Sequence, residues 1–532
     1  MRPRRDSRIV DRAPIAVFAA VEAGALALYM VLGRWLWFYN DEWDFLATRR
    51  AGDLGDLFRP HNEHWQTLPV LLYRALYGIF GLHTYFPYQL CAVLSHLTAA
   101  ALLFVVMLRA RVRPWIATSA ASLFVLFGSG GANITRAFQI GFTGSLVFGL
   151  AHLILADHDG PLDRRDRLGL LAGLLGLMTS GVAVAMVIVV GLVVVARRGW
   201  RAALFHVVPP AACYGVWFAA SGHAGYTRGS PTARGVEEFV SKGLRNTYGL
   251  LGNVAWVGSL LAVVLVAGLI LAVVQARRSG QLPARLAPLG LLVGSLLLLV
   301  ITATGRASSF GSTYALQPRY AYLVAAMTLP ALAVAADALT SRGRWFLPVA
   351  MALFLVGIPG NVRAFVRIER EAQRLDQETR RLVISIPMDP RAREVPRTLR
   401  PETAFSQHLT VGWILDQAAH HELPGGHISK AAFAVTDFRL SFDRAPGAGP
   451  SGACGRLLHS MAVRLKPGDV IGVFDNPLMV RSAKIGMLVP LVFRPTDGSS
   501  VVVLSDPGPV IIGPRNGNAP PRVCLPADAS GR

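Results

Sequence analysis

Charged residues are scarce in this chain of 532 residues. Asp, Glu, Lys and Arg make up 16% of it, whereas 53% is hydrophobic; a soluble protein of this size usually carries about 25% charged residues. The apolar residues are grouped in long runs, which excludes an ordinary soluble protein and predicts an α-helical polytopic membrane protein. The first run, residues 13–38, is too long for a signal peptide and lacks a small-residue cleavage site, so we expect it to remain as a helix.

Acidic residues are scarcer than basic ones, at 32 against 53, and the net charge is +21. A net charge of this size is typical of nucleic-acid-binding proteins. Here, however, the arginines are not gathered on one face or in one tail. They punctuate the apolar runs, as cytoplasmic loop anchors do, so we expect no nucleic-acid partner. A glycine-rich nucleotide loop is also missing, which argues against a cytoplasmic nucleotide-sugar donor.

One apolar run is too long for a single crossing. Residues 168–196 would form a helix of about 43 Å, whereas the hydrocarbon core is about 30 Å thick. Both ends are basic, and Thr179-Ser180-Gly181 is a plausible break, so we expect a hairpin of two short helices. The sequence then predicts about eleven crossings, with the N-terminus cytoplasmic. The expected apolar runs are 13–36, 86–108, 114–130, 137–156, 168–196, 203–220, 249–275, 286–304, 319–340 and 345–360.

The chain divides into a transmembrane domain, residues 1–360, and an extracytoplasmic C-terminal domain, residues 361–532. A charged helix is expected over 362–384, followed by a β-sandwich-like domain of short strands split by Gly, Pro and Asp. Its expected strand segments are AAFAVTDFRLSF, MAVRLKPGDVIGVF, KIGMLVPLVF, SSVVVLS and GPVIIG. The predicted outward loops are 37–85, 131–136, 221–248 and 305–318.

Cysteine is rare, with four residues in the chain. Cys91 and Cys213 lie in apolar runs, where a small buried side chain is the ordinary interpretation. Cys454 and Cys524 both fall in the predicted outer domain. A disulfide between them fits an oxidising compartment, and the sequence leaves its formation open.

The first outward loop is unusually rich in titratable groups. It opens with YNDEWDFL, which places Asp41, Glu42 and Asp44 directly after the first apolar run. These acids alone are compatible with a solvated helix end. The same loop continues with RPHNEHWQTLP, and clusters of carboxylates and imidazoles often mark chemistry. The candidate substrate-binding residues that it adds are His61, Glu63 and His64.

No cofactor is certain from these residues. The two histidines are three positions apart, whereas the helical zinc motif needs four. A divalent cation bridging a carboxylate and a phosphate is one alternative. Direct binding of substrate hydroxyls or of a phosphate is the other.

Cations follow in the last outward loop. Residues 304–322 read TGRASSFGSTYALQPRYAY and contain Arg306, Arg319 and Tyr320. An arginine at the start of a membrane helix can snorkel to headgroups, or it can bind a phosphate through two parallel hydrogen bonds. Weaker candidates of the same kind are Arg136, Arg228, Arg234, Lys242 and Arg245.

At these residues the sequence resembles the GT-C class of integral-membrane glycosyltransferases, which use polyprenyl-phosphate-linked sugars. The resemblance rests on Asp41-Glu42 after the first run, on the predicted hairpin and on Pro318-Arg319-Tyr320. An amphipathic helix over 69–80 fits the same class. Ser180 stands where the family's hairpin motif has a lysine.

The resemblance implies a glycosyltransferase with Asp41 as catalytic base and Glu42 or Asp44 as its helper or an acceptor ligand. The implied partners are a polyprenyl-phosphate sugar donor, membrane lipids and a glycan, lipid or protein acceptor. The implied location is the plasma membrane, facing the cell envelope.

Two other functions remain open. A transporter or flippase of lipid-linked saccharides would line a pathway with intramembrane acids, and Glu22 and Asp337 are the acids placed within apolar runs. We find no internal repeat of the kind common in transporters. A non-catalytic assembly protein of the cell envelope is the other alternative.

Overall fold

The chain forms two compact units, each with its own hydrophobic core. The structure is a computed structural model that describes residues 12–225, 230–343, 345–402, 406, 408–445, 452–482, 488–492, 499–515, 518–526 and 529. Unit 1 comprises Met1–Arg34, Ala51–Leu72 and Phe86–Glu371, and unit 2 comprises Trp35–Arg50, Tyr73–Tyr85 and Ala372–Arg532. Residues 1–11, Arg228 and residues 484–487 and 493 of the expected strand segment KIGMLVPLVF lie outside the described residues.

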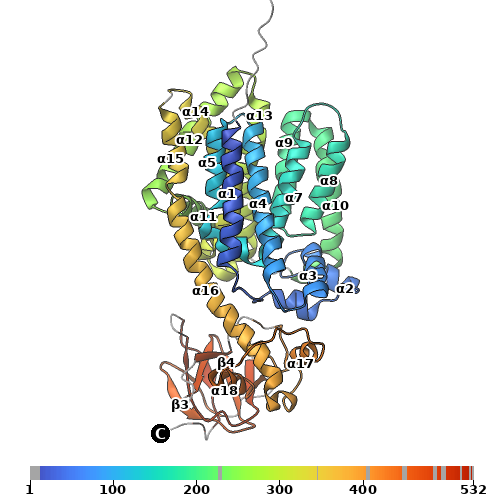
Figure 1. Cartoon of the computed structure of the whole chain (residues 1–532), viewed down its shortest axis with the longest axis vertical. Coiled ribbons are helices and arrows are strands. Elements are labelled where there is room, and N and C mark those ends of the chain that lie inside the picture. The colour runs from blue at the N-terminus through green and yellow to red at the C-terminus, as the bar shows by residue number, and fades with distance from the viewer. Residues whose placement is uncertain are drawn as a thin grey trace, which may run out of the picture. The chain divides into compact units, whose positions relative to one another are not determined.

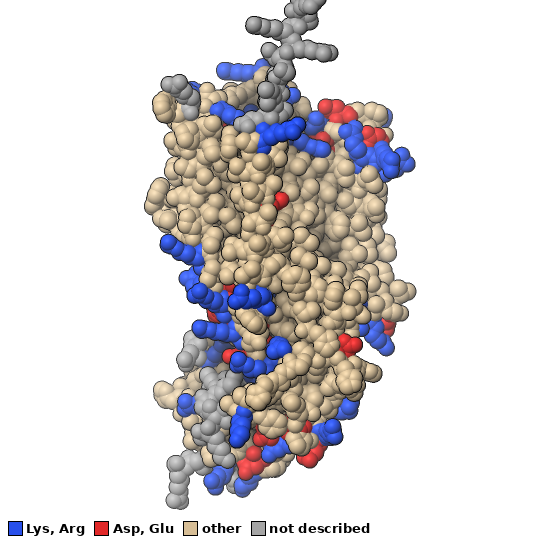
Figure 2. Space-filling view, in the orientation of Figure 1, with Lys and Arg blue, Asp and Glu red and all other residues tan. Residues whose placement is uncertain are grey.

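Unit 1 is a bundle of long apolar helices that run side by side (Figure 1). Nine helical segments of the described residues are long and apolar enough to cross a membrane. The face of unit 1 drawn in Figure 2 shows a broad band almost without charged residues. The prediction of an α-helical polytopic membrane protein is therefore confirmed. The segments are Ala13–Leu32 (α1), Phe86–Arg109 (α4), Pro114–Thr135 (with α5, Pro114–Val125, and α6, Gly131–Thr135), Ala137–Ala156 (with α7, Ile140–Ala156), Trp200–Ala220 (α10), Ala255–Arg278 (α12), Leu282–Phe310 (α13), Pro318–Thr340 (α14) and Phe346–Met388 (with α15, Phe346–Leu355, and α16, Ile358–Ser385).

The predicted hairpin is present. Helix α8, Arg164–Leu177, and helix α9, Val182–Arg198, are separated at the expected Thr179-Ser180-Gly181 break. With 14 and 17 residues they are shorter than the nine segments above. The nine segments above are the ones long and apolar enough to span among the described residues, so the count of eleven crossings and the orientation of the chain across the membrane stay predictions.

Helix α14 is the centre of the bundle. Of the most apolar stretch of 18 residues in α14, 94% is buried. The helix packs against α4, α5, α12 and α13. The approach of α12 is close enough to require Gly268, because a Cβ there would lie 2.3 Å from the carbonyl oxygen of Ala335.

Shorter helices connect these segments. The amphipathic helix expected over 69–80 is α3, Thr67–Phe80, and the charged helix expected over 362–384 lies within α16. The expected loops are partly helical: 131–136 contains α6, α13 continues to Phe310 and therefore carries Arg306, and 221–248 contains most of α11, Ala233–Gly252. The other short elements are α2 (Leu54–Phe58), α11 (Ala233–Gly252), η1 (Asp44–Thr48), η2 (Gly128–Gly130), η3 (Ala137–Gln139), η4 (Gly222–Gly225), η5 (Ser312–Leu316), η6 (Ile386–Met388) and η7 (Pro390–Arg393).

Unit 2 contains two antiparallel sheets that share one hydrophobic core, as a β-sandwich does. One sheet has the order β1-β7-β4-β9-β2 and the other β3-β8-β5-β6. The prediction of a β-rich C-terminal region is confirmed. The strands are β1 (Phe442–Arg444), β2 (Cys454–Arg456), β3 (Met461–Arg464), β4 (Val470–Phe474), β5 (Leu478–Ser482), β6 (Leu488–Val492), β7 (Ser499–Val503), β8 (Pro509–Pro514) and β9 (Arg522–Cys524).

One expected strand is a helix. Most of the segment AAFAVTDFRLSF forms α18, Lys430–Arg439, and only its end enters β1. The hydroxyl of Ser429 caps α18 by accepting a hydrogen bond from the Ala432 amide at 3.2 Å, and the alanines that follow favour a helix over a strand. A second helix of this unit is α17, Val411–Ala419.

The disulfide left open by the sequence is present. Cys454 on β2 lies opposite Cys524 on β9 in register, and the two are bonded across a sequence separation of 70 residues. The bond restricts the unfolded chain, so replacing both cysteines by serine should lower the stability of this domain by about 2–4 kcal/mol. Thermal unfolding of the full chain measures the loss. Cys213→Ser, at an exposed free cysteine, is the control, and equal unfolding temperatures for both variants would contradict the prediction.

Candidate functional site

The acids after the first helix stand in a tight turn of unit 2. Asn40 adopts a left-handed conformation with φ 54°, which Asn tolerates better than most residues. The amide of Trp43 then donates to the Asn40 carbonyl at 3.2 Å, and the amide of Asp44 to the Asp41 carbonyl at 3.1 Å. The turn presents three neighbouring carboxylates to three different environments.

Glu42 is buried and held by its neighbours, with 1% of its surface exposed. One carboxylate oxygen accepts hydrogen bonds from the Tyr73 and Tyr85 hydroxyls at 2.6 and 2.7 Å. The other accepts from the backbone amide of Tyr39 at 2.7 Å. These contacts are within unit 2 and fix the shape of the loop, so they favour a positioning role for Glu42.

Asp44 is also engaged by its own segment. Its Oδ2 accepts hydrogen bonds from Nε and an amino group of Arg49 at 2.9 and 2.7 Å, and both side chains are buried. Its Oδ1 accepts the Thr48 hydroxyl. This buried ion pair ties Asp44 to its own loop, and the substrate contact of Asp44 stays a prediction. Asp41 differs from both acids because it is partly exposed.

Unit 1 contains a cavity of about 860 Å³. It lies where α7, α9 and α14 begin and where α10 and α13 end. This is the end of the bundle that the sequence predicts to face outward. The lining residues are Glu63, His64, Phe142, Gly181, Val182, Val184, Tyr214, Phe218, His223, Leu298, Ile301, Thr302, Thr304, Gly305, Arg306, Tyr320 and Leu323.

The lining changes from apolar to charged along α13. Leu298, Ile301 and Gly305 follow the spacing of one helix face, and Arg306 lies near the end of the helix. From Leu298 to Arg306 the helix rises about 12 Å. The cavity therefore offers apolar contact toward the middle of the span and, at its end, the Arg306 guanidinium beside the Glu63 carboxylate.

Glu63 and Arg306 form an ion pair on the cavity wall. Their closest N–O distance is 2.5 Å, and both side chains are about one-fifth exposed. Burial raises the pKa of the Glu63 carboxyl above its usual range, and the Arg306 guanidinium opposes that shift. Sequence reasoning identified both residues, and the structure brings them together although 243 positions separate them.

His64 joins the first loop to the hairpin. Its Nδ1 accepts a hydrogen bond from the Gly181 amide at 3.3 Å, and burial together with Arg306 lowers its pKa to about 3. A neutral imidazole that accepts at Nδ1 carries its proton on Nε2. His64 is therefore a neutral hydrogen-bond donor that keeps its state across physiological pH.

Gly181 is required for this contact, because a Cβ there would lie 2.9 Å from Nδ1 of His64. The hairpin tip is fixed by further bonds within unit 1. The Leu68 amide donates to the Met178 carbonyl at 3.1 Å, and the Ser145 hydroxyl bonds the Ser180 carbonyl at 3.2 Å. The cavity wall that Val182 and Val184 contribute is thereby held in place.

Arg319 directly precedes Tyr320, which lines the cavity. Its guanidinium carbon lies 5.4 and 5.3 Å from the rings of Tyr314 and Tyr320, and one amino group donates to the Tyr314 hydroxyl at 2.5 Å. Its Nε is buried without a hydrogen-bond partner among the described residues. Arg319 also contributes to the electrostatic environment of Glu63 and His64. Tyr314 was not singled out from the sequence, where an ordinary interfacial tyrosine looks the same.

The other predicted residues lie elsewhere. His61 is buried, with its ring centroid 5.2 Å from that of Phe138, and it does not line the cavity. Arg234 and Lys242 pair with Glu238 on α11. Arg136 and Arg245 do not line the cavity either.

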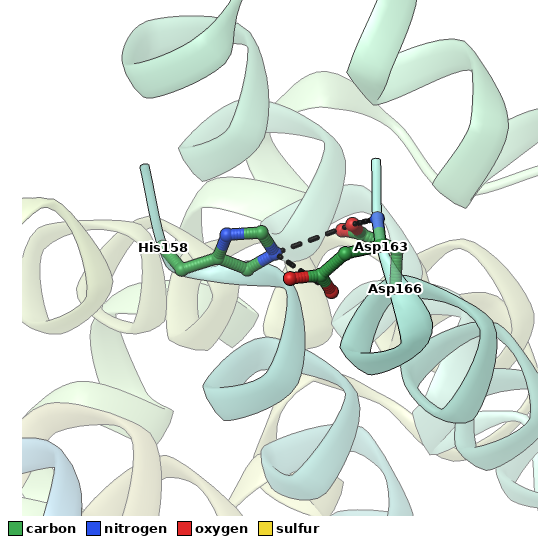
Figure 3. Close-up of side chains that lie close together, drawn as sticks. All are labelled: His158, Asp163 and Asp166. Carbon is green, nitrogen blue, oxygen red and sulfur yellow. Dashed lines mark hydrogen bonds and ion pairs between the residues drawn. The ribbon is translucent and has the colours of Figure 1, made fainter. Parts of the chain in front are cut away.

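A second polar cluster lies where the connection from α7 enters α8. His158, Asp163 and Asp166 point toward one another (Figure 3), with ligand atoms within 4.8 Å, and they are the one such group of three in the described residues. Asp166 also binds Arg198 at 2.5 Å and His206 at 2.9 Å, and Asp163 binds Arg165 at 2.8 Å. These arginines already balance the carboxylates, so the cluster is better described as a structural clamp than as a metal centre.

Comparisons with known proteins give a partial structural likeness and no family. No protein-family model matches the sequence, and no curated protein matches it either. Among solved structures, the chain is similar to the crystal structure of ArnT from Cupriavidus metallidurans in the apo state. The sequence identity is 14% and the TM-score 0.43, over 81% of this chain and 92% of that chain. A likeness at this level assigns no role to any residue.

Proposed function

We propose that the chain is a glycosyltransferase that moves a sugar from a polyprenyl-phosphate donor to an extracytoplasmic glycan, lipid or protein acceptor. The cavity of unit 1 carries the proposal. Its apolar wall on α9 and α13 suits the first isoprenoid units, and Arg306 suits the phosphate. Glu63, His64 and Tyr320 offer hydrogen-bond groups to sugar hydroxyls beside it, and Arg319 adds positive charge nearby.

The reaction is a single displacement at the anomeric carbon. The acceptor hydroxyl oxygen attacks that carbon, the bond from the carbon to the phosphate oxygen breaks, and the polyprenyl phosphate leaves with the bonding electrons. The acceptor proton goes to the general base, Asp41 by the resemblance. Positive charge at Arg306 and Arg319 stabilises the leaving phosphate, and attack opposite to the leaving group inverts the anomeric configuration.

Two of the loop acids have different roles in this proposal. Asp41 is the partly exposed carboxylate and takes the proton. Glu42, with its two tyrosine hydroxyls and one amide, positions the turn. A divalent cation at the loop carboxylates is a separate proposal, and loss of transfer in a chelator with recovery on adding Mg²⁺ or Mn²⁺ would support it.

The function is tested by incubating the purified protein with a panel of lipid-linked sugars. Hexose and pentose polyprenyl monophosphates are supplied with cell-envelope extract as acceptor, and released polyprenyl phosphate is measured. Release that depends on the acceptor supports the proposal. Saturable donor binding with movement across vesicles and no release would instead support a flippase.

Arg306 provides a prediction within this assay. Arg306→Gln should lower kcat/KM by about 10- to 100-fold, the value of one hydrogen bond to a charged group. Arg306→Lys should lose less because it keeps the charge. Arg234→Gln, which removes an exposed arginine of α11, is the matched control. An unchanged kcat/KM in Arg306→Gln would remove this residue from the donor site.

A further inference from the structure

Helix α16 carries a row of arginines along one face. Their spacing of four, three, four and seven residues keeps them within a narrow arc of the helix. All are exposed, and Figure 2 shows Lys and Arg gathered where Figure 1 draws α16. We call this set the arginine stripe: Arg363, Arg367, Arg370, Arg374 and Arg381.

The opposite face of α16 explains how the helix is held. Phe365, Asp376 and Val383 are almost wholly buried, and the amide of Trp37 donates to Asp376 at 2.9 Å. The stripe takes no part in this packing. Among the described residues none of its guanidiniums has an ion-pair partner within 4.0 Å, although Glu371 and Glu378 are exposed on the same helix.

An unpaired row of like charges destabilises a helix, because residues three and four apart repel each other. An external anionic surface would remove that repulsion. Arginine suits phosphate in particular, because its planar group donates two parallel hydrogen bonds. The stripe therefore has the chemistry of a phosphate-binding surface.

The stripe begins where the lipid-facing surface ends. Exposed apolar residues, among them Val349, Leu355 and Val356, precede it on α15 and the short connection to α16. From Phe346 to Arg363 the two helices rise at most about 25 Å, close to the hydrocarbon thickness of about 30 Å. Arg363 and Arg367 thus reach headgroup depth, whereas Arg374 and Arg381 lie about 16 and 27 Å further along than Arg363.

We propose that Arg363, Arg367 and Arg370 bind the phosphates of anionic phospholipids in the leaflet where α16 leaves the membrane. Juxtamembrane arginine clusters are attracted to anionic leaflets, and the attraction falls off within a Debye length of about 10 Å. The contribution must therefore decrease along the stripe from Arg363 to Arg381. The proposal concerns lipid around the protein and stands independently of the transfer reaction.

The test uses two double variants that remove equal charge from the same face of the same helix. The near variant is Arg363→Gln/Arg367→Gln and the far variant is Arg374→Gln/Arg381→Gln. The full chain carries a fluorophore at Val366→Cys, with Cys91 and Cys213 replaced by serine, and is reconstituted in phosphatidylcholine nanodiscs. The nanodiscs contain a minor fraction of nitroxide-labelled lipid, either phosphatidylglycerol or phosphatidylcholine, which quenches the fluorophore. The ratio of quenching by phosphatidylglycerol to quenching by phosphatidylcholine gives the local lipid preference.

The unsubstituted stripe should prefer phosphatidylglycerol by about fivefold or more, the effect of one basic residue at a membrane surface. The near variant should lower the ratio several-fold, with a residual preference from the retained Arg370, and the far variant should change it by less than about twofold. Arg363→Lys/Arg367→Lys should retain most of the preference, which separates charge from folding. Equal quenching by both lipids in the unsubstituted protein overturns the proposal. Heparin binding is measured on the same variants. If only the far variant loses the lipid preference, and heparin binding is also abolished in it, the stripe would be assigned to an anionic polysaccharide.

Discussion

Asp41→Asn should reduce glycosyl transfer by about 10²- to 10⁴-fold, the usual contribution of a general base. Asparagine has nearly the same shape as aspartate but does not accept the acceptor's proton at neutral pH. Donor binding should be unchanged, because the proposed phosphate contacts lie on Arg306 and Arg319. The measurement is kcat for release of polyprenyl phosphate, together with the KM of the donor.

Two other carboxylates provide the comparison. Glu63→Gln removes the anion that pairs with Arg306 inside the cavity, so it should alter donor KM more than kcat. Glu42→Gln leaves an amide against two tyrosine hydroxyls and the Tyr39 amide, which should lower unfolding temperature as well as activity. Full activity in Asp41→Asn with a large kcat loss in Glu63→Gln would move the base from the loop to the cavity.

The sequence predicts the membrane helices well because their signal is local. Length and hydropathy decide which segments span, and Thr179-Ser180-Gly181 breaks a run that is too long for one crossing. The disulfide partners follow from the count of cysteines in one predicted domain. The segment at 431–442 was predicted wrongly, since a short apolar run fits a strand and a helix equally until Ser429 caps α18.

The candidate site was predictable in its residue types but not in its grouping. Glu63, His64, Arg306 and Tyr320 were all identified from outward segments, and the structure lines one cavity with them. The burial of Glu42 and Asp44 was not predictable, because it depends on Tyr73, Tyr85 and Arg49, which look like ordinary loop residues. Three acids in one short stretch therefore divide into one partly exposed carboxylate and two that hold the loop.

Asp166→Ala should be the most destabilising single substitution in the helical unit. The Asp166 and Arg198 side chains are 0% and 3% exposed and bind each other at 2.5 Å. Asp166 also bonds His206 and His158, at 2.9 and 3.2 Å. Removing it leaves a buried guanidinium without its carboxylate, which typically costs about 3–5 kcal/mol.

Unfolding of the purified protein by added SDS, followed by tryptophan fluorescence, measures this loss. Asp163→Asn is the matched control: its side chain is 39% exposed and pairs with the exposed Arg165, so a change below about 1 kcal/mol is expected. Combining Asp166→Ala with Arg198→Met removes both charges, and the pair should be more stable than Asp166→Ala alone. If Asp166→Ala unfolds like Asp163→Asn, the hairpin is held by its apolar packing and not by this buried ion pair. If the double variant is the least stable of all, the loss in Asp166→Ala does not come from an unpaired guanidinium.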